Sequence, residues 1–246
     1  MTTLRPAPRI SFEFFPPQSL DASFKLWETV QVLAPMAPNF VSVTYGAGGT
    51  TRKLTHDAVA TIKRNYGLNV AAHLTCVDAT RAETLEIAAA YAEAGVTEIV
   101  ALRGDAPKGA ARFTPHPDGF ANSVELVAAL AKTGKFKLRV GAYPEAHPDA
   151  ADRFADVTWL KRKIDAGASS AITQFFFEAD TFFRFRDACV KAGITAPIIP
   201  GILPIQSWEG TKKFAARCGA SIPYRLDEGF AAAKRDGREE LLALTQ

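Results

Sequence analysis

Short apolar segments alternate with longer amphipathic segments along almost the whole chain, and this alternation constrains the fold more than any other feature of the sequence. The apolar segments predict strands at residues 10–14, 40–45, 70–76, 98–102, 138–143, 171–176 and 197–202. The amphipathic segments predict helices at about 21–34, 51–66, 81–94, 120–131, 150–166, 179–192 and 208–217. Strict alternation of this kind predicts an α/β fold in which helices cover a parallel sheet.

The positions of polar residues favour a barrel over an open, doubly wound sheet. Near the carboxyl ends of six successive strands stand residues suited to chemistry or recognition: Glu13, Thr44, His73, Arg103 with Asp105, Tyr143, and Gln174. In (β/α)8 barrels the active site lies at that end of the strands. An unsatisfied buried polar group costs about 1–3 kcal/mol, so packing alone is a poor explanation for six of them. We therefore predict a (β/α)8 TIM-type barrel.

Glu13 is the first candidate for catalysis. In an extended strand, Phe12 and Phe14 point to one face and Glu13 to the other, and the two prolines that follow end the strand. The surrounding phenylalanines are expected to disfavour the charged carboxylate and raise the pKa of Glu13. A carboxylic acid that is still protonated near neutral pH is a candidate general acid. The alternative interpretation is a solvated glutamate at a strand end.

Composition narrows the possible partners and location. The chain has 246 residues, 48% hydrophobic and 22% charged, which predicts a single domain over 1–246, with a flexible start at 1–9 and an atypical segment at 221–246. The net charge is +3, and Lys and Arg are scattered among Asp and Glu without forming a basic stripe. We therefore expect no nucleic-acid partner. No apolar run approaches the length of a membrane span. Three widely separated cysteines predict free thiols, no metal site and a cytoplasmic location.

Two loops attract functional interpretations. The segment GAGGTT at 46–51 follows a strand and opens a helix, as dinucleotide fingerprints do, but Thr51 replaces the third small residue and no acid ends a strand about 20 residues later. We interpret it as a glycine-rich turn that borders the barrel site. The loop at 103–119 is long and rich in Gly and Pro, which predicts a functional lid.

Eight motifs, in order from residue 10 to about 223, resemble methylenetetrahydrofolate reductase. They are SFEFFPP (11–17), VSVTYGA (41–47), HLTCVDAT (73–80), ALRGD (101–105), AYPEAHP (142–148), LKRK with DAGA (160–163 and 165–168), AITQFFF (171–177) and IPGILP (199–204). The resemblance implies a (β/α)8 barrel that holds FAD. In such an enzyme FAD takes a hydride from NADH or NADPH and passes it to 5,10-methylenetetrahydrofolate, giving 5-methyltetrahydrofolate in a ping-pong cycle.

The resemblance also implies roles for individual residues. Glu13 matches the proton donor and Asp105 a carboxylate near the flavin and the pterin. Glu13, Thr44, Asp105 and Gln174 match positions that contact the substrates. The positions that match FAD contacts are Thr44, Tyr45, His73, Arg103, Gly104, Asp105, Ala121, Tyr143, His147, Ala150, Asp156, Arg162 and Lys163. Taken without the resemblance, a residue such as His73 is more often a hydrogen-bonded core histidine, and Arg162 and Lys163 fit a solvated helix face equally well.

The sequence departs from the family pattern in two respects. Phe120 and Trp159 stand where relatives often carry tyrosine and asparagine, so single cofactor contacts are expected to be lost. Relatives continue to an eighth strand whose arginine helps hold the folate, whereas only one more helix, at about 226–244, is predicted here. We therefore expect the eighth strand to be missing, folate affinity to be weakened and a homo-oligomer to be possible. Alternatives are a flavin- or folate-binding barrel with little turnover, and a cofactor-free folate methyltransferase.

Overall fold

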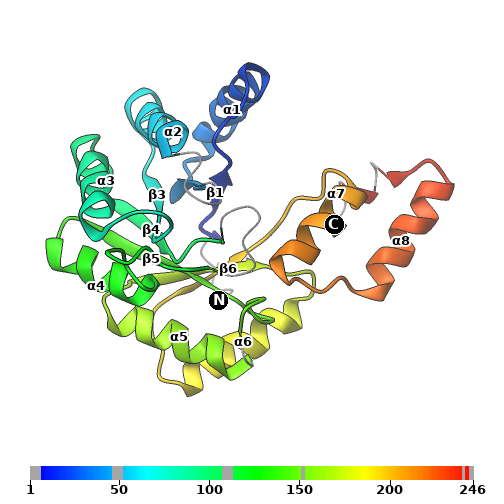
Figure 1. Cartoon of the computed structure of the whole chain (residues 1–246). Coiled ribbons are helices and arrows are strands. Elements are labelled where there is room, and N and C mark those ends of the chain that lie inside the picture. Colours follow the sequence, from blue (N-terminus) through cyan, green and yellow to red (C-terminus); the bar gives the residue numbers. More distant parts are fainter. Residues whose placement is uncertain (1–6, 46–51, 107–112, 151–152, 240–241, 244–246) are drawn as a thin grey trace, which may run out of the picture. The chain divides into compact units, whose positions relative to one another are not determined.

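The computed structural model describes residues 7–45, 52–106, 113–150, 153–239 and 242–243 (Figure 1). Within these residues the strands are β1 (Ser11–Phe14), β2 (Phe40–Val43), β3 (Val70–Thr75), β4 (Glu98–Leu102), β5 (Lys137–Ala142), β6 (Ser170–Phe175) and β7 (Ile198–Gly201). The α-helices are α1 (Leu20–Leu33), α2 (Arg52–Tyr66), α3 (Arg81–Glu93), α4 (Ser123–Thr133), α5 (Arg153–Asp165), α6 (Ala179–Lys191), α7 (Trp208–Cys218) and α8 (Tyr224–Arg235). The predicted strand–helix alternation is confirmed.

The strands follow one another in the sheet in chain order, from β1 to β7. The pairings described from β1 to β4, and that of β6 with β7, are parallel. The register places Glu13 opposite Ser42 on β2, and His73 of β3 opposite Val100 on β4. Because parallel strands end at the same edge, the side chains that follow β1 to β4 share one edge of the sheet. The predicted α/β class and barrel order of strands are thus confirmed, with seven strands in the part of the chain described.

The chain divides into two compact units, of which the first comprises Met1–Arg139 and Ala166–Ala168. Every residue of β2 and β3 is buried, as expected for strands covered on both faces. Helices α1, α2 and α3 lie side by side along these strands (Figure 1). Their buried residues, among them Val30, Val59 and Tyr91, form one apolar core with Phe14. The strands that carry the predicted site residues from Glu13 to Asp105 therefore belong to a unit with one continuous apolar core.

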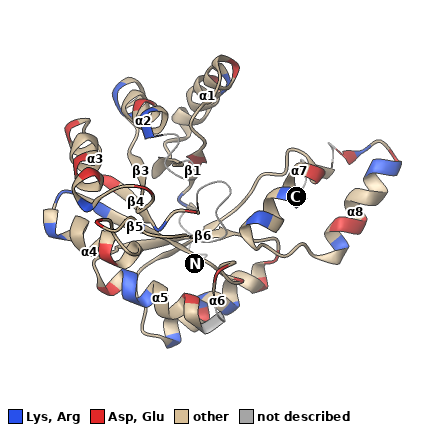
Figure 2. Cartoon of the chain, in the orientation of Figure 1, with Lys and Arg blue, Asp and Glu red and all other residues tan. Residues whose placement is uncertain are grey.

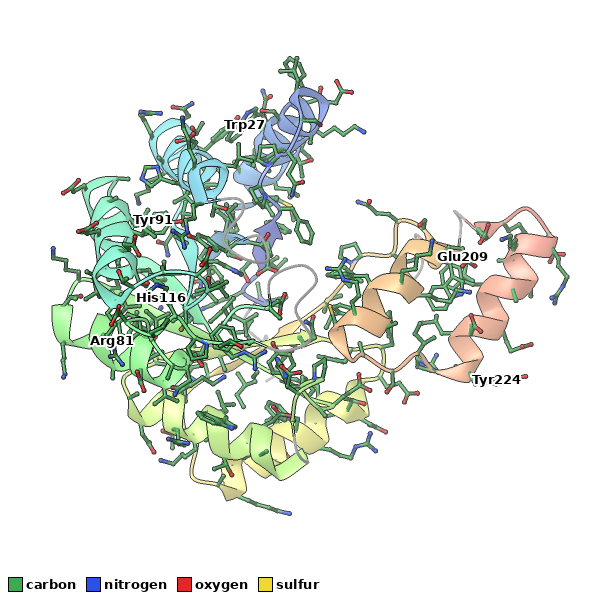
Figure 3. All side chains as sticks on the ribbon, in the orientation of Figure 1. Trp27, Arg81, Tyr91, His116, Glu209 and Tyr224 are labelled. Atoms are coloured by element: carbon green, nitrogen blue, oxygen red, sulfur yellow. The ribbon has the colours of Figure 1, made fainter. Side chains whose placement is uncertain are left out.

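The second unit comprises Val140–Asp165 and Ser169–Gln246. In it, α7 and α8 pack through Trp208 and Phe230, whose stacked rings have centroids 4.3 Å apart. Helix α8 begins at Tyr224, whose side chain is exposed (Figure 3). The predicted single helix over 226–244 is wrong in extent, because α8 ends at Arg235 and Gly237 adopts a left-handed conformation with φ of 65°.

Two further sequence expectations can be compared with the structure. Helix α1 begins at Leu20, one residue before its predicted start, because Ser19 caps it: the Ser19 hydroxyl accepts a hydrogen bond from the Ala22 amide. Lys and Arg alternate with Asp and Glu along the helices (Figure 2). Among the described residues no helix combines the length and apolar character needed to cross a membrane. The segment 46–51 and the lid residues 107–112 lie outside the described residues.

Candidate active site

Glu13, Ser42 and His73 meet at the centre of the first unit. The Nε2 atom of His73 lies 3.2 Å from Oε2 of Glu13, and the Ser42 hydroxyl donates a hydrogen bond of 3.1 Å to the same oxygen. The side chain of His73 is buried, whereas that of Glu13 is 48% exposed. Adjacent strands β1, β2 and β3 supply the three residues, so the sheet register fixes the cluster. A carboxylate that is half open to solvent and held against an imidazole is suited to moving protons.

The expectation of a raised pKa for Glu13 is wrong. Burial is the largest single influence and does raise it, but the charge and close contact of the His73 imidazole and the hydrogen bond from Ser42 together outweigh burial. The pKa of Glu13 therefore lies below its ordinary value of 4.5. The phenylalanines next to Glu13 in the sequence point to the other face, where Phe12 and Phe14 join the core.

The residues that follow β2 lie beside this cluster in the chain. The Thr44 amide donates to the carbonyl of Phe14, and its own carbonyl accepts from the Thr55 hydroxyl. Tyr45 is half-buried, and burial raises its pKa despite the opposing effect of the Arg52 guanidinium. Arg52, the first residue of α2, also donates to the carbonyl of Asp78 at 2.7 Å. Arg52 thus ties the loop after β3 to the residues that follow β2.

The end of β4 is shaped by the close approach of Gly104 to β3. Gly104 has φ of 85°, and a Cβ atom there would lie 2.4 Å from Cγ2 of Val77. Only glycine fits this position without displacing its neighbours. The Arg103 guanidinium lies 5.1 Å from the centre of the Phe113 ring, and Asp105 is exposed. Arg103, Gly104 and Asp105 therefore reach the same edge of the sheet as Glu13.

Ala121 lies on the surface of the first unit, just before α4. Its amide donates at 3.3 Å to Oε2 of Glu125, an oxygen that Arg81 also contacts. Phe120, beside it, is 1% exposed and its ring is covered by the Arg81 guanidinium at 4.8 Å from the ring centre. Phe120, which stands where relatives often carry tyrosine, is thus a core residue.

A second group of predicted residues gathers after β5 in the second unit. The rings of Tyr143 and His147 meet edge to face with centroids 4.5 Å apart. The His147 amide donates to Oδ2 of Asp156 at 2.9 Å, and the Ala150 amide donates to the His147 carbonyl at 2.8 Å. Asp156 lies in the first turn of α5. The loop after β5 is therefore fastened to the start of α5, with Tyr143 presented at its beginning.

Lys163 is a half-buried cation of this second group. Its ammonium donates to the carbonyl of Gly141 at 2.5 Å. Burial lowers the pKa of Lys163 to about 8, although the carboxylate of Asp156 acts in the opposite direction. Arg162 is exposed instead, and its guanidinium lies 4.4 Å from the centre of the Trp159 ring. The two neighbouring cations thus occupy different environments, one interior and one at the surface.

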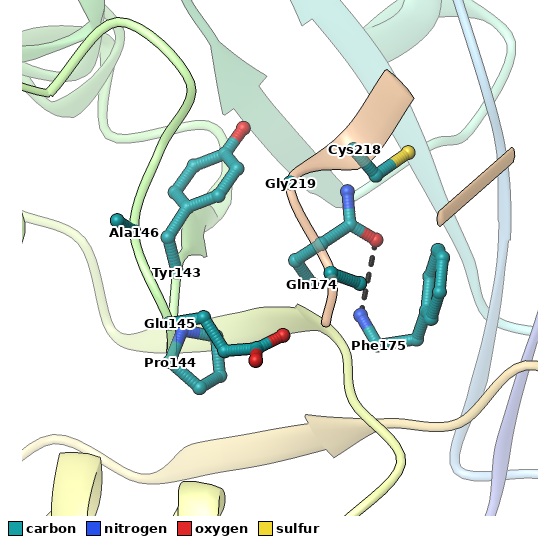
Figure 4. Close-up of a pocket in the computed structure, with 9 residues that line it drawn as sticks. Tyr143, Pro144, Glu145, Ala146, Gln174, Phe175, Cys218 and Gly219 are labelled. Carbon is teal, nitrogen blue, oxygen red and sulfur yellow. Dashed lines mark hydrogen bonds between the residues drawn. The ribbon is translucent and has the colours of Figure 1, made fainter. Parts of the chain in front are cut away.

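Gln174 projects into a small pocket of the second unit, between Tyr143 and Cys218 (Figure 4). Its amide oxygen accepts a hydrogen bond of 3.0 Å from the Phe175 amide. This bond fixes the side-chain rotamer and leaves the amide nitrogen as the donor. The lining residues are Tyr143, Pro144, Glu145, Ala146, Gln174, Phe175, Cys218, Gly219 and Ala220. Gln174 and Tyr143, both predicted site residues, are thus brought together.

The sequence reasoning missed three residues that support these sites. Ser42 was detectable, since a serine within the buried segment FVSV needs a hydrogen-bond partner. Arg52 gave no signal, because its partners are backbone carbonyls 25 and 26 residues away. Glu145 accepts from the Ser221 amide at 2.8 Å, a contact that spans 76 residues. Long-range contacts of this kind leave no local pattern.

Comparison with known proteins identifies relatives of the whole chain. The family described as methylenetetrahydrofolate reductase matches residues 4–241. A 5,10-methylenetetrahydrofolate reductase of Pectobacterium carotovorum is 47% identical over 92% of this chain and 74% of its own length. The Salmonella typhimurium enzyme of the same name is 45% identical over 95% of this chain and 77% of its own length.

Solved structures with low sequence identity share the fold. A 2,3-dimethylmalate lyase is 12% identical and has a TM-score of 0.50 over 93% of this chain and 82% of its own. A deoxyribose phosphate aldolase from Aeropyrum pernix is 18% identical, with a TM-score of 0.51 over 78% of this chain and 76% of its own. At these identities the likeness concerns the architecture alone.

Proposed function

Because this chain belongs to the methylenetetrahydrofolate reductase family, we propose that it reduces 5,10-methylenetetrahydrofolate to 5-methyltetrahydrofolate, with FAD as cofactor and NADH or NADPH as hydride source. The observation that carries the proposal is the carboxylate of Glu13, half open to solvent and 3.2 Å from a buried histidine at the carboxyl end of the sheet. Opening the five-membered ring of the folate requires a proton at the departing nitrogen, and Glu13 is the group placed to deliver it.

Residues of each unit, considered separately, have the chemistry that the proposed cofactor requires. Lys163 offers an interior ammonium, and a diphosphate is bound by cationic and N–H donors. Gly104 packs against Val77 and Thr75 where no Cβ atom would fit, which fixes the backbone that follows β4 beside the proposed site. The residues proposed to hold FAD are Thr44, Tyr45, His73, Arg103, Gly104, Asp105, Ala121, Tyr143, His147, Ala150, Asp156, Arg162 and Lys163. When bound, FAD would supply the hydride chemistry.

The chain's own residues would supply orientation and protons. Glu13 gives its proton to the departing ring nitrogen: the Glu13 O–H bond breaks, an N–H bond forms and the C–N bond releases its electrons to that nitrogen. The Gln174 amide nitrogen is free of the bond that holds its oxygen and would donate to the substrate. Asp105, exposed at the end of β4, would accept hydrogen bonds from the pterin. Thr44 would contact the folate or the nicotinamide.

Anaerobic stopped-flow spectroscopy of FAD-reconstituted protein tests the proposal. We expect NADH or NADPH to bleach the flavin and methylenetetrahydrofolate to restore its colour. Glu13→Gln should preserve bleaching and slow folate-dependent reoxidation by about 10²–10⁴-fold, the usual contribution of a general acid. Glu28→Gln, on the exposed surface of α1, is the matched control and should behave as wild type. Bleaching without folate-dependent reoxidation in the wild type would contradict turnover and favour a flavin-binding protein.

A further inference from the structure

We propose that His73 is the proton reservoir of Glu13, so that the two side chains act as one acid that holds its proton on the imidazole until the folate binds. The inference deepens the proposed function and rests on it. The role of Glu13 as a general acid conflicts with its surroundings. A general acid must be protonated, yet the surroundings of Glu13 favour its charged form. A carboxylate that is already ionised needs a second group to supply the proton it gives away.

The contact geometry identifies that group. Nε2 of His73 lies 3.2 Å from Oε2 of Glu13, and this buried nitrogen forms no hydrogen bond with any described group, so Glu13 is the acceptor nearest to its proton. The Ser42 hydroxyl donates to the same oxygen and orients the carboxylate without supplying a titrating proton. His73 is buried, so bulk water does not readily compete for its Nε2 proton. The arrangement therefore connects one interior imidazole to one carboxylate that is open to substrate.

Other described groups around the pair do not offer the proton. The register partner of Glu13 on β2 is Ser42, which is neutral, and the register partner of His73 on β4 is the apolar Val100. The groups acting on the Glu13 carboxyl are His73 and Ser42. Of these two, only the imidazole is an acid–base group that can hand a proton to the carboxylate. His73 is therefore the partner that decides the protonation of Glu13.

Substrate binding supplies the switch. While Glu13 faces solvent, water stabilises an ion pair between the imidazolium and the carboxylate. A bound folate excludes that water, and the loss of solvation disfavours the separated charges. The imidazolium N–H bond then breaks as an O–H bond forms on Oε2 of Glu13, leaving two neutral groups. Glu13 passes this proton to the departing folate nitrogen and becomes a carboxylate again. After product leaves, solvent returns a proton to the neutral His73 ring, which restores the ion pair.

Kinetics of the separated half-reactions provide one test. His73→Gln keeps a polar side chain of similar reach but holds no transferable proton. Because His73 is also among the residues proposed to hold FAD, the reduction rate by NADH is measured for each variant and the reoxidation rate is compared after division by it. Reoxidation by methylenetetrahydrofolate should fall about 10–100-fold at neutral pH and approach the wild-type rate near pH 5.5, because Glu13 must then take its proton from solvent. His56→Gln, on α2 outside the proposed site, is the matched control. Equal wild-type and His73→Gln pH profiles, or an equal loss at every pH, would overturn the proposal.

A second measurement does not depend on turnover or on the His73 variant. Nuclear magnetic resonance of ¹⁵N-histidine-labelled wild-type protein reports whether the His73 ring carries a charge. We expect the charge state of the ring to change with the Glu13→Gln substitution, and the wild-type ring to convert toward the neutral form when tetrahydrofolate is added. A ring that is insensitive to both changes refutes the reservoir. If instead the wild type fails to reoxidise with folate while these shifts appear, the proposed function fails and the coupling of the pair stands.

Discussion

Arg139 of β5 and Glu98 of β4 form a buried ion pair, with Nε of Arg139 2.6 Å from Oε2 of Glu98. The two side chains are 2% and 8% exposed. The guanidinium also lies 3.9 Å from the centre of the Phe40 ring, and Asn69 donates to the other carboxylate oxygen at 2.8 Å. Glu98 opens β4 and Phe40 opens β2, so the cluster stands at the amino ends of the strands, opposite the proposed catalytic edge.

Arg139→Met is therefore expected to act on stability and not on chemistry. Removing one partner of a buried pair leaves an uncompensated charge and costs about 3–5 kcal/mol in the free energy of unfolding. Urea unfolding measures the loss, and Arg184→Met on the exposed face of α6 is the control, with a change within about 0.5 kcal/mol. The flavin reduction rate per folded protein should stay unchanged. A drop in that rate with full stability would contradict the structural role.

The lowered pKa of Glu13 predicts how the stability of the protein depends on pH. Because its folded pKa lies below the ordinary value of 4.5, its carboxylate contributes stability above pH 4.5, and this contribution is lost as the pH falls through the lower folded value. The difference in unfolding free energy between wild type and Glu13→Gln should thus shrink between pH 5.5 and pH 3.5. Urea titrations of both proteins across that range check the sign. A difference that grows toward acid pH would restore the raised pKa expected from the sequence.

The strand order and the pKa of Glu13 show what the sequence could and could not predict. The strand order was predictable, because buried parallel strands leave continuous apolar runs such as β2 and β3. The edge that carries Glu13 and His73 was predictable from the same alternation. The pKa of Glu13 was not, since its partners are 29 and 60 residues away and its phenylalanine neighbours point to the other face. Lys163 could equally have been solvated, but in the structure its ammonium reaches back to the carbonyl of Gly141 on β5, 22 residues away.

Arg52 is expected to restrain the loop after β3. Its guanidinium donates to the carbonyls of Val77 and Asp78 at 3.2 and 2.7 Å, and Asp78 is held at φ of 49°. A left-handed conformation costs a non-glycine residue about 1–3 kcal/mol and persists only where contacts impose it. Arg52→Gln should therefore lower the free energy of unfolding by about 1–3 kcal/mol and accelerate amide hydrogen exchange at 77–80.

Asp78→Gly provides the internal control for Arg52. Glycine adopts positive φ without strain, so the restraint becomes less important. The cost of Arg52→Gln should be smaller in the Asp78→Gly background than in the wild type, which a double-mutant cycle measures. Strictly additive effects would show that Arg52 does not act through the conformation of this loop.

The lowered pKa of Lys163 predicts that the folded protein gains stability at alkaline pH. Burial lowers its folded pKa from 10.5 to about 8, so the folded state bears the cost of a buried charge below pH 8. Between pH 8 and pH 10.5 the unfolded chain binds more protons than the folded one, and stability rises with pH. Relative to Lys163→Met, which carries no charge, the wild type should gain stability across this window. Lys191→Met, at an exposed position on α6, should run parallel to the wild type.

In the proposed FAD site, the same amine is expected to link FAD binding to proton uptake. An anionic diphosphate beside Lys163 favours its charged form, so binding of FAD to the apoprotein at pH 9 should take up a proton that the free amine has lost. Calorimetry in buffers of different ionisation enthalpy measures this uptake. We expect it in the wild type and in Lys191→Met, a much smaller uptake in Lys163→Met, and none in any of them at pH 6.5, where the amine is already charged. Undiminished uptake by Lys163→Met would mean that another group meets the diphosphate.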